Sequence, residues 1–327
     1  MGEPAGIGGE IALLAWQRRT AGNLPPFFLI DDPARLRDLA ARLGWQVPIH
    51  TIETPAEALP TFGKALPVLS EPLAAPVIPG RPDAENASAV LRSIDRAVMF
   101  AKLGAVAGIV TNPIAKDVLY RAGFRHPGHT EYLAHLTGAA QPAMMLAVEG
   151  LRVVLATIHL SLRDAVGALS VDAIVQAGKA AHEGLQRDFG IARPRLVVAA
   201  LNPHGGEQGA LGREEIDIVQ PAVAALKLHG INATGPFPAD TLFHHAARQG
   251  YDAAVCLYHD QALVPLKTID FEGGVNVTLG LPIVRTSPDH GTAFGIAGRG
   301  TASPASLMAA LRMATEISER RSHARNA

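Results

Sequence analysis

Hydrophobic and polar positions divide the chain into two alternating kinds of segment. Short runs of β-branched and small apolar residues, among them FFLID, GIVTN, RLVVAALN and DAAVCLY, are followed by longer segments whose apolar residues recur with helical spacing. The short runs have no polar face, which is typical of strands covered on both sides. The pattern therefore predicts an α/β fold with parallel sheets.

Local signals place two helices and one irregular stretch. Ser170 is a candidate cap for a helix over residues 170–189, and Pro304 occupies the favoured first position of a helix over residues 303–320. Between residues 54 and 85 proline, alanine and leucine dominate, which excludes one continuous helix. This stretch is too apolar for a flexible linker, and we expect an irregular surface segment with one short strand.

Composition narrows the classes of partner. The 327 residues are 48% hydrophobic, enough for one large core or two ordinary ones. With 29 basic and 30 acidic residues the net charge is −1, so the chain has no field that would gather nucleic acid or coat an anionic membrane. The start MGEPAGIGGE does not resemble a signal peptide, and no apolar run is long enough to span a membrane. We expect a cytoplasmic protein with a small-molecule partner and no nucleic-acid or membrane partner.

Three apolar runs end in a histidine, and this is the most informative pattern in the chain. His159 follows LRVVLATI, His204 follows LVVAALNP, and His259 follows AAVCLY, whose Cys256 has the setting of a small core residue. The carboxyl ends of parallel strands lead into the ligand-binding loops of α/β sheets, so these histidines can converge although they are far apart in sequence. Three imidazoles suit a catalytic divalent metal. The alternative is three unrelated structural or surface histidines.

A second group of residues is suited to anions. In HPGHTEYLA, His129 and Thr130 precede a helix, where backbone N–H groups, a hydroxyl and an imidazole can hold phosphate. Lys267, Asn276 and Arg285 suit a substrate that carries carboxylate and phosphate. The alternatives are a helix cap at Thr130 and ordinary solvated charges. Asn112 and Lys116, after the run GIVT, have similar chemistry, and the glycine-rich start matches neither a Rossmann nor a P-loop spacing.

Long motifs in this chain carry a family resemblance. GEPAGIGGE, TNPIAKDVLYRAGF, HPGHTEYLA, TIHLSLRD, LNPHGGEQGALGREE, PADTLF, YHDQALVPLK and GVNVTLGLPIVRTSPDHGTAFGIAG occur in order over nearly the whole chain. Together they resemble the 4-hydroxythreonine-4-phosphate dehydrogenases of pyridoxal 5'-phosphate biosynthesis.

The resemblance implies a fold like that of isocitrate and isopropylmalate dehydrogenases, with two α/β/α domains and a cleft between them. One domain would comprise residues 1–118 and 281–327, and the other residues 119–280. A homodimer with its active site at the subunit interface is implied, in which one metal ligand can come from the partner. His159, His204 and His259 would bind the metal, and the substrate would be contacted by His129, Thr130, Lys267, Asn276 and Arg285.

The implied reaction is a metal-dependent oxidation by NAD⁺ or NADP⁺, and the metal would be Zn²⁺, Mg²⁺ or Co²⁺. The C3 hydroxyl of 4-phosphohydroxy-L-threonine becomes a ketone, and the resulting 3-oxo acid decarboxylates to 3-amino-2-oxopropyl phosphate. Lys267 is a candidate for proton transfer, although a substrate clamp suits it better. Asp240 and Asp260 would lie beside the metal, where Asp240 either caps a helix or orients a site group. No residues are assigned to the cofactor.

The start of the chain departs from the family pattern. Family members usually carry a β-strand before the glycine-rich turn, whereas Met1 directly precedes Gly2 here. Either the natural start lies upstream or the strand is absent. A polypeptide beginning at Met1 is then expected to be less stable, because the neighbouring strands would expose backbone groups.

Other functions remain open at this point. Within the family, threonate or erythronate 4-phosphate dehydrogenases and dihydrodiol dicarboxylate dehydrogenases share the carboxylate and vicinal hydroxyls of the substrate. Outside it, three histidines are compatible with a metal-dependent phosphate-ester hydrolase or lyase. A sugar-phosphate binding protein without catalysis is a third possibility, which three strand-end histidines disfavour.

Overall fold

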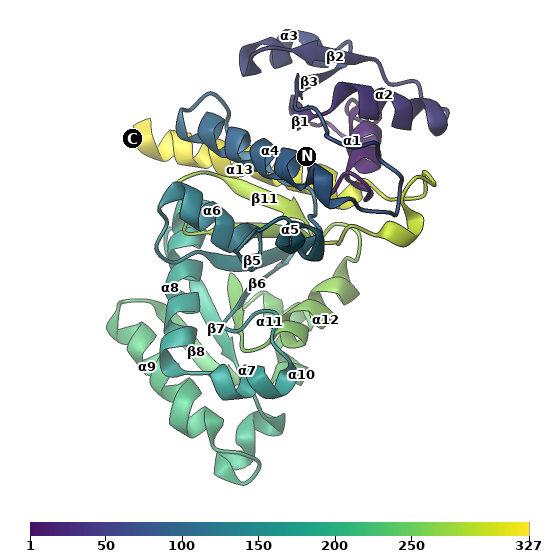
Figure 1. Cartoon of the computed structure of the whole chain (residues 1–327). Helices are drawn as coiled ribbons and strands as arrows, with labels where there is room; N and C mark the ends of the chain where they lie inside the picture. Colours follow the sequence, from purple (N-terminus) through teal and green to yellow (C-terminus); the bar gives the residue numbers. More distant parts are fainter. Residues whose placement is uncertain (327) are drawn as a thin grey trace. The chain divides into compact units, whose positions relative to one another are not determined.

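The computed structural model describes residues 1–326 and divides into two compact units (Figure 1). Unit 1 comprises residues 1–139 and 281–318, and unit 2 comprises residues 140–280 with the chain end from residue 319. Each unit combines strands with helices. The predicted α/β class is therefore confirmed.

Unit 1 contains two sets of parallel strands. Its elements are α1 (Gly8–Gln17), β1 (Leu29–Asp31), α2 (Pro33–Arg42), β2 (Ile49–Ile52), η1 (Pro55–Glu57), α3 (Ala58–Phe62), β3 (Leu66–Ser70), η2 (Ala84–Asn86), α4 (Ala87–Lys102), β4 (Ile109–Val110), α5 (Lys116–Arg121), α6 (His129–Thr137), β11 (Arg285–Pro288), η5 (Phe294–Ile296) and the start of α13 (Ala305–Asn326). Strands β1, β3 and β2 form a sheet in that order, and β4 pairs in parallel with β11.

The proline-rich stretch of unit 1 is more ordered than its composition suggests. The expected single strand is β3, which forms the centre of the three-stranded sheet and buries Leu66 and Val68. The short α3 precedes it, so the stretch is not wholly irregular. Apolar contacts with α1 and α2 offset the poor strand propensity of this stretch, because Leu66 and Val68 belong to the same core cluster as Leu13 and Leu36.

Unit 2 is built around a mixed sheet with the order β10-β5-β6-β9-β7-β8. Its elements are β5 (Ala143–Val148), β6 (Leu151–Leu155), α7 (Leu162–Ala168), α8 (Val171–Arg187), β7 (Arg195–Ala199), η3 (Pro203–Gly209), the π-helix η4 (Glu215–Val219), α9 (Gln220–Leu228), β8 (Asn232–Phe237), α10 (Ala239–Leu242), α11 (His245–Arg248), β9 (Ala253–Cys256), α12 (His259–Ile269) and β10 (Val275–Leu279). Ser170 caps α8 by accepting a hydrogen bond from the N–H of Ala173 at 3.2 Å, as predicted.

The sheet of unit 2 is only partly parallel, unlike the prediction. Strands β6, β9, β7 and β8 are parallel, whereas β5 runs antiparallel to both β6 and β10. The two-residue turn between β5 and β6 contains Gly150 at φ 76°, a conformation that glycine adopts without steric cost. Both faces of these strands are buried, so their apolar pattern does not reveal their direction.

Within residues 1–326, no helix combines the length and the apolar character that crossing a membrane requires.

Candidate active site

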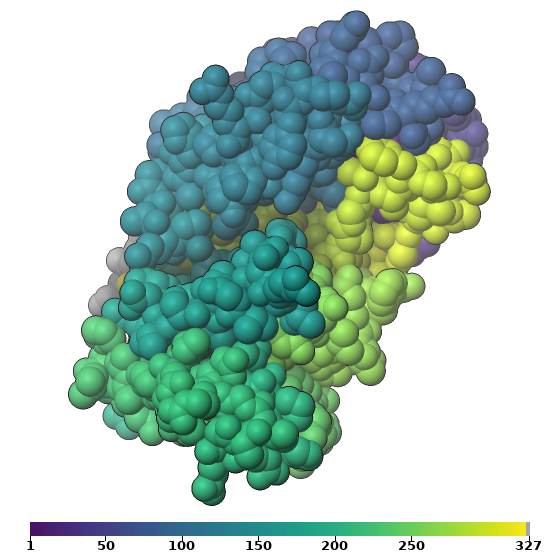
Figure 2. Space-filling view, turned by 60° about the horizontal axis from the view of Figure 1, so that its bottom comes forward, coloured from purple at the N-terminus to yellow at the C-terminus, as the bar shows by residue number. Residues whose placement is uncertain are grey.

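The three strand-end histidines lie at the carboxyl ends of neighbouring parallel strands in unit 2. His159 follows β6, His204 is in η3 after β7, and His259 is the first residue of α12 after β9. Strand β9 lies between β6 and β7, so the three loops leave the same edge of the sheet. In Figure 2 the teal surface near residue 160 and the yellow-green surface near residue 260 are neighbours.

Two buried side chains fasten these loops together. Thr157 donates its hydroxyl to the carbonyl of Leu257 at 2.7 Å, which joins the loop after β6 to the loop after β9. Gln261 accepts from the N–H of Leu257 and donates to the carbonyl of Ala200, both at 2.7 Å, which joins the loop after β9 to the loop after β7. Buried amides paired on both ends hold a single geometry, because each lost partner leaves an unsatisfied polar group.

The loop that carries His204 has a strained path. Residues 204–208 all have positive φ, and three of them are not glycine: His204 at 52°, Glu207 at 44° and Gln208 at 55°. Buried Glu215 holds the start of the loop by accepting from the N–H groups of Leu201 and Asn202 at 2.8 and 2.7 Å. His159 is also left-handed, with φ 53°. Non-glycine residues in this region cluster at functional sites, where the surrounding structure maintains them.

A single chain brings two of the predicted metal ligands together. The ring centroids of His159 and His259 are 6.0 Å apart. A histidine bound to zinc has its ring centroid roughly 3 Å from the ion, so two rings at this separation fit a shared ion. The Nδ1 atom of His259 lies 2.8 Å from a carboxylate oxygen of Asp260, so Nε2 is the ring nitrogen that could bind a metal. Within residues 1–326, however, no three His, Cys, Asp or Glu side chains form a metal-binding group, so His204 does not join the pair.

In unit 1, His129 and Thr130 form the start of α6 as the sequence predicts, but Thr130 is not its cap. Gly128 occupies the cap position, and the helix begins at His129. The Nε2 atom of His129 is buried and has no hydrogen-bond partner within the described residues. Burial lowers the pKa of His129 well below its ordinary value, and the nearby charges of Arg285 and Lys116 act in the same direction. His129 is therefore neutral at physiological pH and offers an uncharged ring nitrogen.

Arg285 supplies a buried cation to the same unit. Its side chain is in β11, the residue is 4% exposed, and Nη2 donates to the hydroxyl of Thr111 at 2.7 Å. Burial lowers the pKa of Arg285 to about 10, so it stays charged at neutral pH. Thr111 directly follows β4. The buried charge of Arg285 and the neutral ring of His129 suit a bound anion.

The remaining predicted residues are in unit 2. Lys267, in α12, is partly buried with its ammonium 5.4 Å from the ring centroid of Phe271, and Asn276, in β10, donates to the sulfur of Met144 at 3.0 Å. The Oδ1 atom of Asn276 is buried without a hydrogen-bond partner among the described residues. Asp240 is exposed in α10 and Asp260 is exposed in α12. Asp240 lies inside α10, whose cap is Pro238, so it does not cap this helix.

Several residues that shape the site were missed by the sequence reasoning. Thr111, Gln261 and Glu215 act through contacts with residues distant in sequence, which no local pattern reveals. His290 is within a motif of the family resemblance, and its buried Nε2 has no hydrogen-bond partner among the described residues. The buried Oδ1 of Asn112 likewise has none among these residues. Cys256 is fully buried, and burial raises the pKa of its thiol, in agreement with a core role.

Strand-end histidines, a buried arginine and several unsatisfied buried polar atoms are the features of an α/β enzyme rather than of a structural domain. Comparison with known proteins gives the same class. Residues 23–314 match the model of the family described as pyridoxal phosphate biosynthetic protein PdxA. The chain is 54% identical over 326 residues to the 4-hydroxythreonine-4-phosphate dehydrogenase of Caulobacter vibrioides, covering 98% of this chain and 96% of that protein.

Solved structures extend the comparison. The 4-hydroxythreonine-4-phosphate dehydrogenase of Klebsiella pneumoniae is 41% identical, with a TM-score of 0.86 over 97% of this chain and 98% of that one. A terephthalate 1,2-cis-dihydrodiol dehydrogenase from Burkholderia xenovorans is 29% identical, with a TM-score of 0.62 over 97% of this chain and 96% of that one. This chain belongs to the PdxA family of pyridoxal phosphate biosynthetic proteins.

Proposed function

We propose that this chain is an oxidoreductase that oxidises 4-phosphohydroxy-L-threonine at C3, in pyridoxal 5'-phosphate biosynthesis. The observation that carries this proposal is the identity of 54% over nearly the full length to a 4-hydroxythreonine-4-phosphate dehydrogenase. The hydroxyl-bearing carbon loses a hydride to NAD⁺ or NADP⁺ and its hydroxyl loses a proton. The 3-oxo acid that results loses CO₂ to give 3-amino-2-oxopropyl phosphate.

The residues of unit 1 are suited to holding the charged ends of this substrate. Arg285 presents a buried charge that Thr111 orients, and a guanidinium binds carboxylate or phosphate with two parallel hydrogen bonds. The buried Nε2 of His129 and the side chain of Thr130 would contact the same substrate from the start of α6. In unit 2, Asn276 and Lys267 are the proposed substrate contacts, and Lys267 is also a candidate for proton transfer.

The donor set at the edge of unit 2 fits a divalent metal ion such as Zn²⁺, Mg²⁺ or Co²⁺. When bound, such an ion supplies Lewis-acid chemistry that makes a hydroxyl easier to deprotonate. His159, His204 and His259 would hold it, with Asp260 fixing the orientation of His259. The exposed carboxylates of Asp240 and Asp260 are the candidates for receiving the hydroxyl proton.

A homodimer would complete the metal site. One chain brings His159 and His259 together but forms no group of three ligands within residues 1–326, which is expected if the third imidazole, that of His204, comes from a second copy. His204→Ala and His259→Ala variants should each be inactive. When the two are unfolded and refolded together, mixed dimers should regain part of the activity if the ligands of one site come from both subunits. Absence of recovery in mixed dimers would place all ligands in one subunit.

The substrate of this chain can be identified by comparing the activity of the enzyme with the substrates considered for the family. The dihydrodiol dehydrogenase of Burkholderia xenovorans shares the fold at 29% identity, so aromatic and sugar-acid substrates need to be included. Reduction of NAD⁺ and NADP⁺ should be measured with 4-phosphohydroxy-L-threonine, threonate 4-phosphate, erythronate 4-phosphate and a dihydrodiol dicarboxylate. The proposal requires the highest kcat/KM for 4-phosphohydroxy-L-threonine. Release of inorganic phosphate without NADH formation would instead indicate a phosphate-ester hydrolase.

A further inference from the structure

Lys116, the last residue of the sequence TNPIAK, is not among the proposed substrate contacts, yet its position in unit 1 is well defined. It is the first residue of α5 and follows the connection of residues 111–115 that leaves β4. The N–H of Glu3 donates to the carbonyl of Pro113 in this connection at 2.8 Å, and Ala115 at its end is buried. The backbone that leads to Lys116 is therefore anchored on both sides of Pro113.

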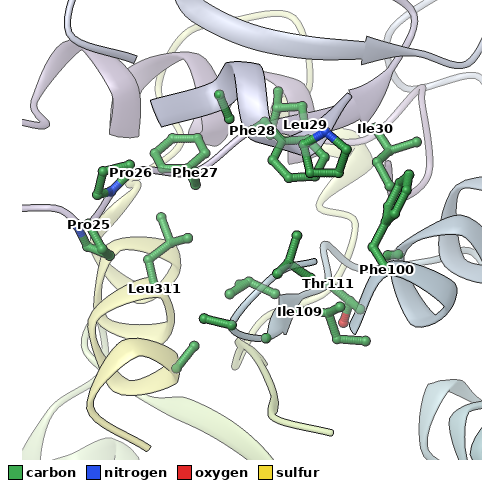
Figure 3. Close-up of a pocket in the computed structure, with 18 of the residues that line it drawn as sticks. Pro25, Pro26, Phe27, Phe28, Leu29, Ile30, Phe100, Ile109, Thr111 and Leu311 are labelled. Carbon is green, nitrogen blue, oxygen red and sulfur yellow. The ribbon is translucent and has the colours of Figure 1, made fainter. Parts of the chain in front are cut away.

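The connection of residues 111–115 also positions the buried cation Arg285. Its first residue, Thr111, accepts from Nη2 of Arg285 at 2.7 Å. Figure 3 shows Thr111 at the wall of an apolar cavity, opposite residues 27–30. Among the described residues, no lysine, arginine or histidine lines this cavity, so it is unsuited to an anion. The charges suited to an anion are those of Arg285 and Lys116, near the two ends of the connection.

The ammonium of Lys116 lies at the start of α6. A Cβ atom added to Gly128, which occupies the cap position of this helix, would lie 3.5 Å from both Cε and Nζ of Lys116. Within the described part of the chain, no side chain caps α6. The first N–H groups of a helix lack partners inside the helix and carry partial positive charge. A cation at this end of a helix is unfavourable unless an anion lies beside it.

No carboxylate among the described residues pairs with Lys116. The exposed ammonium forms neither an ion pair nor a hydrogen bond within residues 1–326. Asp117, the next residue, pairs with Arg121 at 3.7 Å. A carboxylate oxygen of Glu131 lies 3.4 Å from the same Cβ position on Gly128, but it forms no ion pair with Lys116. Lys116 is therefore either a solvated surface charge or the partner of a bound anion.

His129, the first residue of α6, favours the bound anion. Its Nε2 atom is buried and has no hydrogen-bond partner among the described residues. Burial lowers the pKa of His129, and the charges of Arg285 and Lys116 lower it further, so the three side chains are close enough to interact. A neutral ring nitrogen, two cations and the first N–H groups of a helix are together suited to a multiply charged oxyanion.

We propose that Lys116 is a further substrate-binding residue, which pairs with the phosphate group of the substrate at the start of α6. The inference rests on the proposed function, because the phosphorylated substrate supplies the anion. A phosphate monoester carries about −1.5 to −2 charges and three acceptor oxygens. It can therefore accept from the Lys116 ammonium, from the first N–H groups of α6 and from His129 at the same time, whereas a carboxylate has only two oxygens and one charge.

The proposal is tested by comparing substrates with and without the phosphate. Lys116→Met should lower kcat/KM for 4-phosphohydroxy-L-threonine by about 10–100-fold, mainly through KM, because a charged hydrogen bond is lost. For unphosphorylated 4-hydroxy-L-threonine, kcat/KM should change by less than about twofold. Lys116→Arg keeps the charge and should lose less than about fivefold. Lys64→Met, which removes another exposed charge of unit 1, is the matched control and should affect neither substrate.

Binding of inorganic phosphate to the full chain gives a readout that does not require turnover. The titration is followed by phosphorus NMR after removal of divalent ions, so that no metal binds the phosphate. The Kd should rise at least about tenfold in Lys116→Met and stay within about twofold of the parent value in Lys64→Met. Because Lys116 is exposed, the Tm of each variant should stay within about 2 °C of the parent.

Two results would overturn the proposal. Equal losses of kcat/KM for the phosphorylated and unphosphorylated substrates would show that Lys116 acts on a part that both share. An unchanged Kd for inorganic phosphate in Lys116→Met would make Lys116 a solvated surface lysine. Failure of the proposed function looks different: the parent chain would form no NADH, while inorganic phosphate would still bind in a manner that depends on Lys116. That result would support the phosphate contact and reject the reaction.

Discussion

The candidate residues of units 1 and 2 are positioned in different ways. In unit 1, Arg285 is held on a strand by the neighbouring Thr111, and its charge is present before any ligand arrives. In unit 2, His159 and His204 are in left-handed backbone conformations on loops, which Thr157, Gln261 and Glu215 fasten to neighbouring segments. A buried charge therefore characterises the candidate residues of unit 1, and hydrogen bonds between loops position those of unit 2. Changes at Arg285 should therefore affect substrate affinity, and changes in the loops after β6, β7 and β9 should affect metal binding and stability.

The largest effect is expected for Arg285→Met in unit 1. Loss of a buried charge that pairs with an anionic substrate costs roughly 4 kcal/mol, or about 10³-fold in kcat/KM, mainly through KM. Arg285→Lys keeps the charge without the planar fork and should be intermediate. Steady-state kinetics and metal analysis of both variants check this. A normal KM together with lost metal would reverse the assignment of the two units.

The second prediction concerns the fastening of the loops in unit 2. Gln261→Leu leaves the N–H of Leu257 and the carbonyl of Ala200 unpaired and should lower the free energy of unfolding by about 3 kcal/mol. The matched control is Thr268→Val on the same helix, whose hydroxyl donates to Val264 at an exposed position and should matter by less than about 0.5 kcal/mol. Urea unfolding measures both. Equal stabilities would mean that Gln261 does not hold the loops.

Alanine substitutions at Gly206 and Gly230 distinguish a steric collision from backbone strain in the loop that carries His204. A Cβ at Gly206, where φ is 78°, would lie 2.5 Å from a carboxylate oxygen of Glu215. Gly206→Ala should cost about 2–3 kcal/mol and weaken metal binding, because strain and collision add. Gly230→Ala, at φ 76° with nothing within 4 Å, should cost only about 1 kcal/mol. Similar unfolding free energies for the two variants would rule out the collision with Glu215.

Substitution of Asp260 tests whether this residue orients His259 to bind a metal ion. Asp260→Asn should weaken metal binding by about 10–100-fold with little change in stability, as expected when the partner of a metal-binding histidine is altered. Asp217→Asn, which breaks an exposed ion pair with Arg213, is the control and should leave the metal affinity unchanged. Titration with Zn²⁺ followed by calorimetry provides the comparison. The assignment of His259 fails if both variants bind the metal like the parent chain.

The smallest effect is expected from a buried ion pair of unit 2 that has no predicted part in the reaction. Burial raises the pKa of Asp188, but hydrogen bonds from Arg187 and Arg321 outweigh it and hold the pKa below the ordinary value of 3.8. The resulting stability is fully present above the unfolded-state pKa and is lost as pH falls through the lower folded-state pKa. Asp188→Asn should make the decline of Tm with falling pH less steep in this acid range. An unchanged slope of Tm against pH would contradict the role of the Asp188 ion pair.

Sequence patterns identified the strands that carry the chemistry because those strands are short, apolar and each followed by a histidine. They did not reveal the hairpin of β5 and β6, since a strand buried on both faces has the same composition in either direction. The roles of Gln261 and Glu215 were also out of reach. Gln261 belongs to the motif YHDQ, but its partner Ala200 is 61 residues away and becomes a neighbour only when β7 and β9 pair. The position of Thr111 against Arg285 depends on β4 and β11 in the same way.

The most direct test of the account is NADH formation at 340 nm by the purified chain with 4-phosphohydroxy-L-threonine and NAD⁺. The rate should be followed before chelation, after removal of divalent ions, and after addition of Zn²⁺, Mg²⁺ or Co²⁺. We predict turnover that chelation abolishes and at least one of these ions restores. Turnover that is unaffected by chelation, and equally fast in His259→Ala, would contradict a metal-dependent dehydrogenase built on the histidines of unit 2.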